Sequence, residues 1–206
     1  MLGFYNYTVV LTYVGLGCSI FGMMQALNQN YKLAVLFLVM SGICDMLDGK
    51  VARSKKNRTE EEKKFGIQID SLCDLVCFGV FPAVIGYSLG VRGHWEEFCL
   101  VVYVLAAVVR LAYFNVTEEK RQKETDQVRT YYQGLPVTSA AAIFPAIFLF
   151  HGNLLSNDQF RITYLAAVIL VAVLFVTNIR VPKPGNKAIF VFLILGGLLL
   201  AKIMFS

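Results

Sequence analysis

Residues 44–53 read CDMLDGKVAR, and residues 66–74, after an interval of twelve residues, read GIQIDSLCD. Both stretches lie where an apolar segment meets a polar loop, and each carries two aspartates at helical spacing. Asp45 and Asp48 share one face of a helix because they are three residues apart. Asp70 and Asp74 are four residues apart and share a face in the same way. The pattern predicts two adjacent helices that bring four carboxylates to one depth.

The rest of the chain has the composition of a membrane protein. Of its 206 residues 57% are hydrophobic and only 16% are charged, and the mean hydropathy is +0.60. A bilayer core about 30 Å thick needs about 20 apolar residues per helix. These values predict an all-α, polytopic helical bundle with six to eight spans, in a single domain over residues 1–206. The seven candidate stretches are residues 5–27, 32–52, 67–90, 95–116, 135–151, 160–179 and 187–205.

The distribution of basic residues predicts the orientation. The loops at 53–65, 116–133 and 180–187 hold thirteen Lys and Arg residues, and the intervening loops hold three. Basic loops stay in the cytoplasm, so we expect a multi-pass protein of the cytoplasmic membrane with the aspartates facing the cytoplasm. The first segment lacks a basic lead and is expected to be a retained helix. Anionic lipid headgroups or a nucleotide diphosphate suit this basic face, and no nucleic-acid partner is expected.

The four aspartates predict a metal site. One acid inside a span costs about 3 kcal/mol, and four close together also repel one another. Divalent cations with hard oxygen ligands, Mg²⁺ or Mn²⁺, remove both problems, and two such ions can clamp a diphosphate. Helix caps and acids paired with the lysines of the 54–65 loop would explain one or two of the aspartates. A cation transporter with an intramembrane acid cluster is the alternative from another class.

Small residues and one arginine accompany the aspartates. Gly49 and Gly66 allow a ligand to approach the helix backbone closely. Arg53 has the planar fork that binds phosphate. The five cysteines are odd in number and without paired spacing, so they predict no disulfide framework. They are expected to be small residues that pack between helices.

Taken together, these residues resemble the signature D-x-x-D-G-x-x-A-R … G-x-x-x-D-x-x-x-D of the CDP-alcohol phosphotransferase family. All eight fixed positions match, whereas the interval of twelve residues after Arg53 is longer than usual for the family. The resemblance implies that CDP-diacylglycerol is the donor and that its diphosphate bridges two metals on the four aspartates. Gly49, Ala52 and Gly66 would accommodate the cytidine and ribose, and Arg53 would hold phosphate. Asp74 would be the base that deprotonates the acceptor hydroxyl, and CMP would leave.

A second region resembles one branch of that family, the phosphatidylserine synthases. The resemblance rests on residues 110–116 (RLAYFNV), 132–138 (YQGLPVT) and 65–79. It implies L-serine as acceptor, with Arg110 as the cation for its carboxylate and Asn115 as a polar contact. Thr117 and Gln133 are weaker candidates of the same kind, and a snorkelling arginine at a helix end is the alternative for Arg110.

Other features of the chain leave alternatives open. Glycerol 3-phosphate or inositol phosphate as acceptor would require extra basic residues around the pocket. His94 and His151 fall on the predicted outer side and are expected to have interfacial roles. A homodimer is expected from the family. The preferred metal, the acyl or ether nature of the lipid, and direct displacement against a covalent intermediate are left open.

Overall fold

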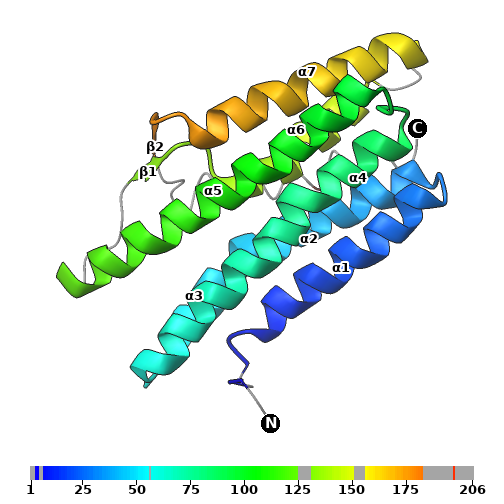
Figure 1. Ribbon diagram of the computed structural model, residues 1–206. Helices are drawn as coiled ribbons and strands as arrows, with labels where there is room; N and C mark the ends of the chain where they lie inside the picture. Colours follow the sequence, from blue (N-terminus) through cyan, green and yellow to red (C-terminus); the bar gives the residue numbers. More distant parts are fainter. Residues whose placement is uncertain are drawn as a thin grey trace.

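The computed structural model describes residues 3–4, 7–55, 57–124, 131–150, 156–182 and Gly197, with backbone only for Arg53 and residues 122–124. Helices run side by side in an elongated bundle (Figure 1). The seven α-helices among the described residues are α1 (Val10–Leu27), α2 (Tyr31–Ser54), α3 (Glu60–Asp74), α4 (Phe81–Ser88), α5 (His94–Glu124), α6 (Ala140–Phe148) and α7 (Asn157–Val176). Shorter elements are a π-helix, η1 (Leu75–Val80), a 3₁₀-helix, η2 (Val137–Ser139), and the strands β1 (Tyr131–Gln133) and β2 (Arg180–Pro182), which pair antiparallel.

Four helical stretches of the described chain are long and apolar enough to cross a membrane: Val10–Leu27, Glu60–Ser88, His94–Arg121 and Asn157–Val176. The predicted fifth stretch forms a shorter apolar helix, Val137–Phe148. The predicted stretch 187–205 lies outside the described residues. The all-α, multi-pass fold class is therefore confirmed, whereas six to eight spans and a single domain over 1–206 stay predictions.

The third span is one continuous helix built from three elements, α3, η1 and α4. It begins at Glu60, and its N-cap is Thr59, whose hydroxyl accepts from the Glu62 amide while the Glu62 carboxylate accepts from the Thr59 amide. This reciprocal capping box explains why the helix begins seven residues before the apolar run. Pro82 has no amide hydrogen, which deprives the Phe78 carbonyl of its helical donor. The Tyr103 hydroxyl donates to that carbonyl at 2.6 Å instead.

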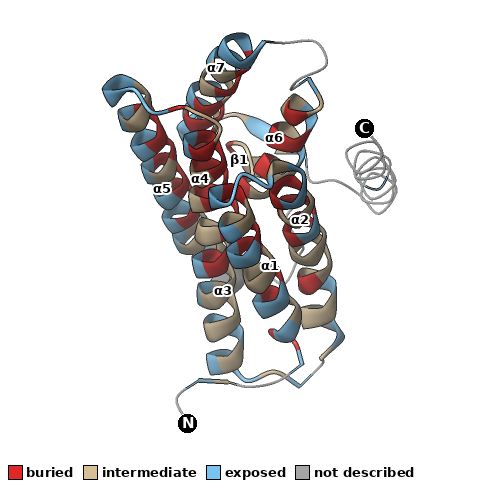
Figure 2. Ribbon diagram, turned by 90° about the vertical axis from the view of Figure 1, so that its right-hand side faces the viewer, coloured by how far each residue is buried: buried red, intermediate tan, exposed pale blue. Residues whose placement is uncertain are grey.

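The buried core occupies one half of the bundle. Buried residues gather on α4, α7 and the adjoining part of α5, whereas the beginning of α3 is half-buried or exposed (Figure 2). The rings of Tyr103, Phe144 and Tyr164 interlock, with centroid distances of 5.7 Å between the first two and 5.0 Å between the last two. The Tyr164 hydroxyl donates to the Pro82 carbonyl at 2.7 Å. This half of the bundle holds in place the helices that carry the aspartates.

Candidate metal site

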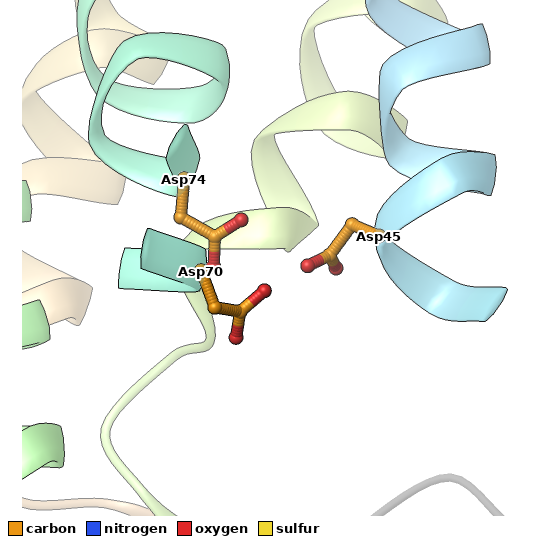
Figure 3. Close-up of side chains that lie close together, drawn as sticks. All are labelled: Asp45, Asp70 and Asp74. Carbon is orange, nitrogen blue, oxygen red and sulfur yellow. The ribbon is translucent and has the colours of Figure 1, made fainter. Parts of the chain in front are cut away.

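Three aspartates from two helices meet in the structure. Asp45 projects from α2 toward Asp70 and Asp74 on α3 (Figure 3). One carboxylate oxygen from each lies within 4.8 Å of the others, the spacing of a group that can hold a metal ion. The helical spacing in the sequence predicted this convergence, because each pair of aspartates was expected on a face directed at the neighbouring helix.

The fourth predicted ligand, Asp48, lies beside this group rather than in it. Its side chain is buried and accepts a hydrogen bond of 2.9 Å from the Thr12 hydroxyl on α1. The carboxylates of Asp48 and Asp70 are within hydrogen-bonding reach of each other. The structure thus brings all four aspartates together, in an arrangement of three plus one.

Two threonines that no sequence motif singles out orient the α2 aspartates. Thr12 binds Asp48, and Thr138, from η2, lies within hydrogen-bonding reach of Asp45. Hydrogen bonds of this kind fix the direction of a metal-ligating carboxylate. The only signal for Thr12 is an isolated polar residue in an apolar run. Thr138 is the last residue of the stretch 132–138, whose resemblance gave it no role.

The donor set fits a divalent cation. Asp70 Oδ1 is buried and has no hydrogen-bond partner among the described residues. None of the four aspartates forms an ion pair with a described Lys or Arg side chain. Two of the four lysines of the 54–65 loop pair elsewhere, Lys55 with Glu62 and Lys63 with Glu60. Pairing with these lysines therefore does not explain the acids, and a bound cation would satisfy the orphaned oxygen.

A small pocket adjoins the carboxylates. Its empty space is about 180 Å³, open mouth included. The π-helix begins directly after Asp74, and π-turns are frequent at functional sites because they redirect side chains within a helix. Cys73 and Cys77 face the pocket as free, buried thiols, in line with packing roles. The lining residues are Thr12, Gly15, Ser41, Asp45, Asp48, Cys73, Asp74, Cys77 and Phe78.

The residues predicted to bind the donor are placed in part. Gly49 and Ala52 are half-buried on the C-terminal half of α2, near Asp48 along the helix, and Gly66 is half-buried on α3. The side chain of Arg53 lies outside the described part of the chain. The positions of Gly49 and Ala52 are compatible with the predicted approach of a ligand to the backbone. The space next to Gly66 is occupied by the Arg58 side chain, whose Nη2 would lie 2.5 Å from an added Cβ.

Arg110 is not at a helix end, because α5 continues to Glu124. Its side chain is 5% exposed, and Nε donates to the Leu135 carbonyl at 3.2 Å. Gly134, which precedes Leu135, has a φ of +80° and passes so close that an added Cβ would lie 3.2 Å from Arg110 Nε. The snorkelling alternative is wrong, since a snorkelling arginine exposes its guanidinium.

The other predicted polar contacts bind within the protein. The Asn115 carbonyl oxygen accepts from the Ser71 hydroxyl at 2.7 Å, which ties α5 to α3 next to Asp70. Thr117 donates to the Phe114 carbonyl of its own helix. Gln133 accepts from the Tyr113 hydroxyl. His94 begins α5, at the opposite end from these contacts, and His151 lies outside the described residues.

Comparison with known proteins now identifies the family. The sequence profile of the CDP-alcohol phosphatidyltransferases matches residues 5–179. The chain belongs to this family. It is 32% identical to CDP-diacylglycerol–serine O-phosphatidyltransferase of Helicobacter pylori (strain 26695) over 176 residues, 80% of this chain and 68% of the relative. The protein of that name from Methanocaldococcus jannaschii is 28% identical over 189 residues, 92% of this chain and 81% of the relative.

The match to the yeast relative covers a smaller share of both proteins. The Saccharomyces cerevisiae protein of the same name is 36% identical over 118 residues, which are 56% of this chain and 41% of that protein. The chain therefore matches less than half of the yeast protein. The chain belongs to a transferase family and has a mostly helical fold with candidate membrane spans. It also carries a carboxylate cluster that could hold a metal ion.

Proposed function

We propose that the chain transfers a phosphatidyl group from CDP-diacylglycerol to the hydroxyl of L-serine, giving phosphatidylserine and CMP. The observation that carries the proposal is the convergence of Asp45, Asp70 and Asp74, with Asp48 beside them, in a chain of this family. The serine acceptor is supported by the names of the relatives.

The aspartates and small residues bind the donor. Asp45, Asp48, Asp70 and Asp74 hold two divalent cations, Mg²⁺ or Mn²⁺. When bound, such ions neutralise the diphosphate and lower the pKa of a nearby hydroxyl. Gly49, Ala52 and Gly66 accommodate the cytidine and ribose, and Arg53 holds phosphate. The carboxylates have the orphaned oxygen and close spacing that this role requires.

Asp74 acts as the general base. It belongs to the wall of the pocket, so an acceptor hydroxyl in the pocket can reach it. The proton of that hydroxyl moves to Asp74 as the oxygen attacks the phosphorus attached to the lipid, and the bond from this phosphorus to the CMP oxygen breaks. Direct displacement needs no further nucleophile.

Arg110 holds the serine carboxylate, and Asn115, whose carbonyl oxygen accepts from the Ser71 hydroxyl, ties α5 to α3 beside it. A guanidinium fork matches a carboxylate in geometry and charge. One short segment links this cation to the metal site: Arg110 binds the Leu135 carbonyl, and Thr138, three residues later, reaches Asp45. Loss of the Arg110 side chain is therefore expected to raise the KM for serine more than the KM for the donor.

The site faces the cytoplasm in this proposal. Asp45 and Asp48 lie on the second half of α2, and in the span Glu60–Ser88 Asp70 lies in the first half and Asp74 at the middle. These are the halves of the two helices that adjoin the basic loop 53–65, and basic loops stay in the cytoplasm. A multi-pass position in the cytoplasmic membrane and contact with membrane lipids follow. A homodimer stays a prediction, supported by the family resemblance alone.

Competition between acceptors tests the proposal. Purified protein with CDP-diacylglycerol and Mg²⁺ or Mn²⁺ receives radiolabelled serine or radiolabelled glycerol 3-phosphate. We expect label from serine in the lipid fraction, together with release of CMP. Conversion of glycerol 3-phosphate but not of serine would assign another acceptor. Metal flux into liposomes without CMP release would support the transporter instead.

A further inference from the structure

The loop between α2 and α3 carries an arginine, Arg58, whose side chain lies over Gly66. A Cβ added at Gly66 would lie 2.5 Å from Arg58 Nη2. The guanidinium therefore covers the glycine at the start of the stripe formed by Gly66, Asp70 and Asp74. One helical turn, about 6 Å along the axis, separates Gly66 from Asp70.

Arg58 is held in place but not neutralised. Its Nη2 donates to the Glu62 carbonyl at 3.0 Å. The nearby Glu62 carboxylate is engaged by Lys55 at 2.7 Å and by the Thr59 amide. Arg58 Nε is buried and has no hydrogen-bond acceptor among the described residues. A buried guanidinium N–H without an acceptor is costly, so this position suits the binding of an anion.

We propose that Arg58 binds a phosphate of the nucleoside diphosphate and closes the Gly66 side of the donor site. This inference rests on the proposed function, because it requires a nucleotide above the α3 stripe. The aspartates bind the diphosphate through cations, whereas Arg58 contacts it directly through a charge-assisted hydrogen bond. The twelve-residue interval after Arg53 thereby acquires a role, since it supplies a cation that the signature lacks.

Titration of CDP into the purified protein tests this role. The measurements use a phosphate-free detergent with Mg²⁺, and the variants are Arg58→Gln and the control Lys64→Gln. Lys64 is an exposed cation on the first turns of α3, so its variant removes the same charge from the same region. We expect Arg58→Gln to weaken CDP binding about tenfold, the loss of one charge-assisted contact, and Lys64→Gln to leave it unchanged.

A double-mutant cycle separates a direct contact from a general change in the loop. Gly66→Ala forces Arg58 away, so Gly66→Ala and Arg58→Gln should be strongly non-additive in CDP affinity. Additive effects would overturn the contact.

The remaining outcomes are also decisive. Equal CDP affinity of the wild type and Arg58→Gln would overturn the role of Arg58, and serine-dependent CMP release by the wild type would show that the proposed function survives. Equal CDP affinity of the two proteins is also the result expected if Arg58 instead binds a lipid headgroup phosphate. A wild-type protein that binds no CDP would overturn both proposals.

Discussion

The two halves of the bundle treat their polar groups in opposite ways. In the aromatic half, built from α4, α7, α6 and the adjoining part of α5, buried hydroxyls have partners: Tyr103 donates to the Phe78 carbonyl and Tyr164 to the Pro82 carbonyl. In the aspartate half, on α2 and α3, Asp70 Oδ1 is buried and has no hydrogen-bond partner among the described residues, and like charges face one another. The first half is arranged for stability. The second retains unsatisfied groups, which the ligands of the proposed function would complete.

The largest expected effect comes from removing charge in the aspartate half. Asp70→Asn should lower transferase activity more than about 1000-fold, which corresponds to about 4 kcal/mol in the activation free energy. The thermal unfolding temperature without metal should stay equal or rise, because one of the mutually repelling charges is gone. Activity and unfolding are measured on the same preparations. Asp158→Asn, an exposed acid in the first turn of α7, is the matched control and should change neither. An active Asp70→Asn enzyme would remove the basis of the metal site.

The next effect belongs to the aromatic half and has the opposite signature. Phe144→Ala deletes a ring that packs against Tyr103 and Tyr164. The lost packing should lower the free energy of unfolding in detergent by about 2 kcal/mol, less than in a water-soluble core because lipid tails are apolar too. Folded enzyme should keep its activity near the wild-type value. Phe98→Ala, at a side chain 53% exposed, should cost little stability. Equal losses in both variants would contradict the division between the halves.

A smaller change of activity is expected from Thr12→Val, which keeps the shape but removes the donor to Asp48. Loss of a hydrogen bond that orients a metal ligand should reduce metal affinity or activity about 10- to 100-fold. The metal dependence of activity should shift to higher concentration. Thr163→Val, where the hydroxyl bonds only to the carbonyl of Gln159 in its own helix, is the control. An unchanged metal dependence in Thr12→Val would show that the hydrogen bond from Thr12 does not orient Asp48 for metal binding.

The smallest effect concerns the proline in the third span. Tyr103→Phe leaves the Phe78 carbonyl without the donor that replaces the missing amide of Pro82. The free energy of unfolding should fall by about 1 kcal/mol, with activity unchanged. Thermal unfolding of this variant beside Tyr113→Phe, whose hydroxyl bonds to Gln133 at the exposed surface, measures the difference. A loss of activity without a loss of stability would show that the Tyr103 hydroxyl contributes to function rather than to stability.

The convergence of the aspartates was predictable, because helical spacing and apolar flanks are local properties of the sequence. The length of α5 was not predicted from hydropathy. Residues 117–124 are polar, yet they continue the helix, since they are good helix formers and Glu118 pairs with Arg121 three residues on. This continuation places Arg110 inside a helix rather than at its end.

Contacts between distant segments were the other part that the sequence could not disclose. Thr12 and Thr138 reach the aspartates from α1 and η2, and their partners are defined only by packing. Arg58 looked like one more topology-setting cation among six basic residues in its loop. Its position over Gly66 depends on the capping box at Thr59, which turns the chain into α3.

Binding of Mn²⁺ to the purified protein, followed by electron paramagnetic resonance in the presence of CDP, tests most directly whether the aspartates form a metal site for a nucleotide diphosphate. The wild-type chain should bind two Mn²⁺ ions, and binding should weaken strongly in Asp70→Asn while Asp158→Asn binds like the wild type. Equal Mn²⁺ binding by the wild type and Asp70→Asn, or no binding by either, would contradict this assignment of the aspartates.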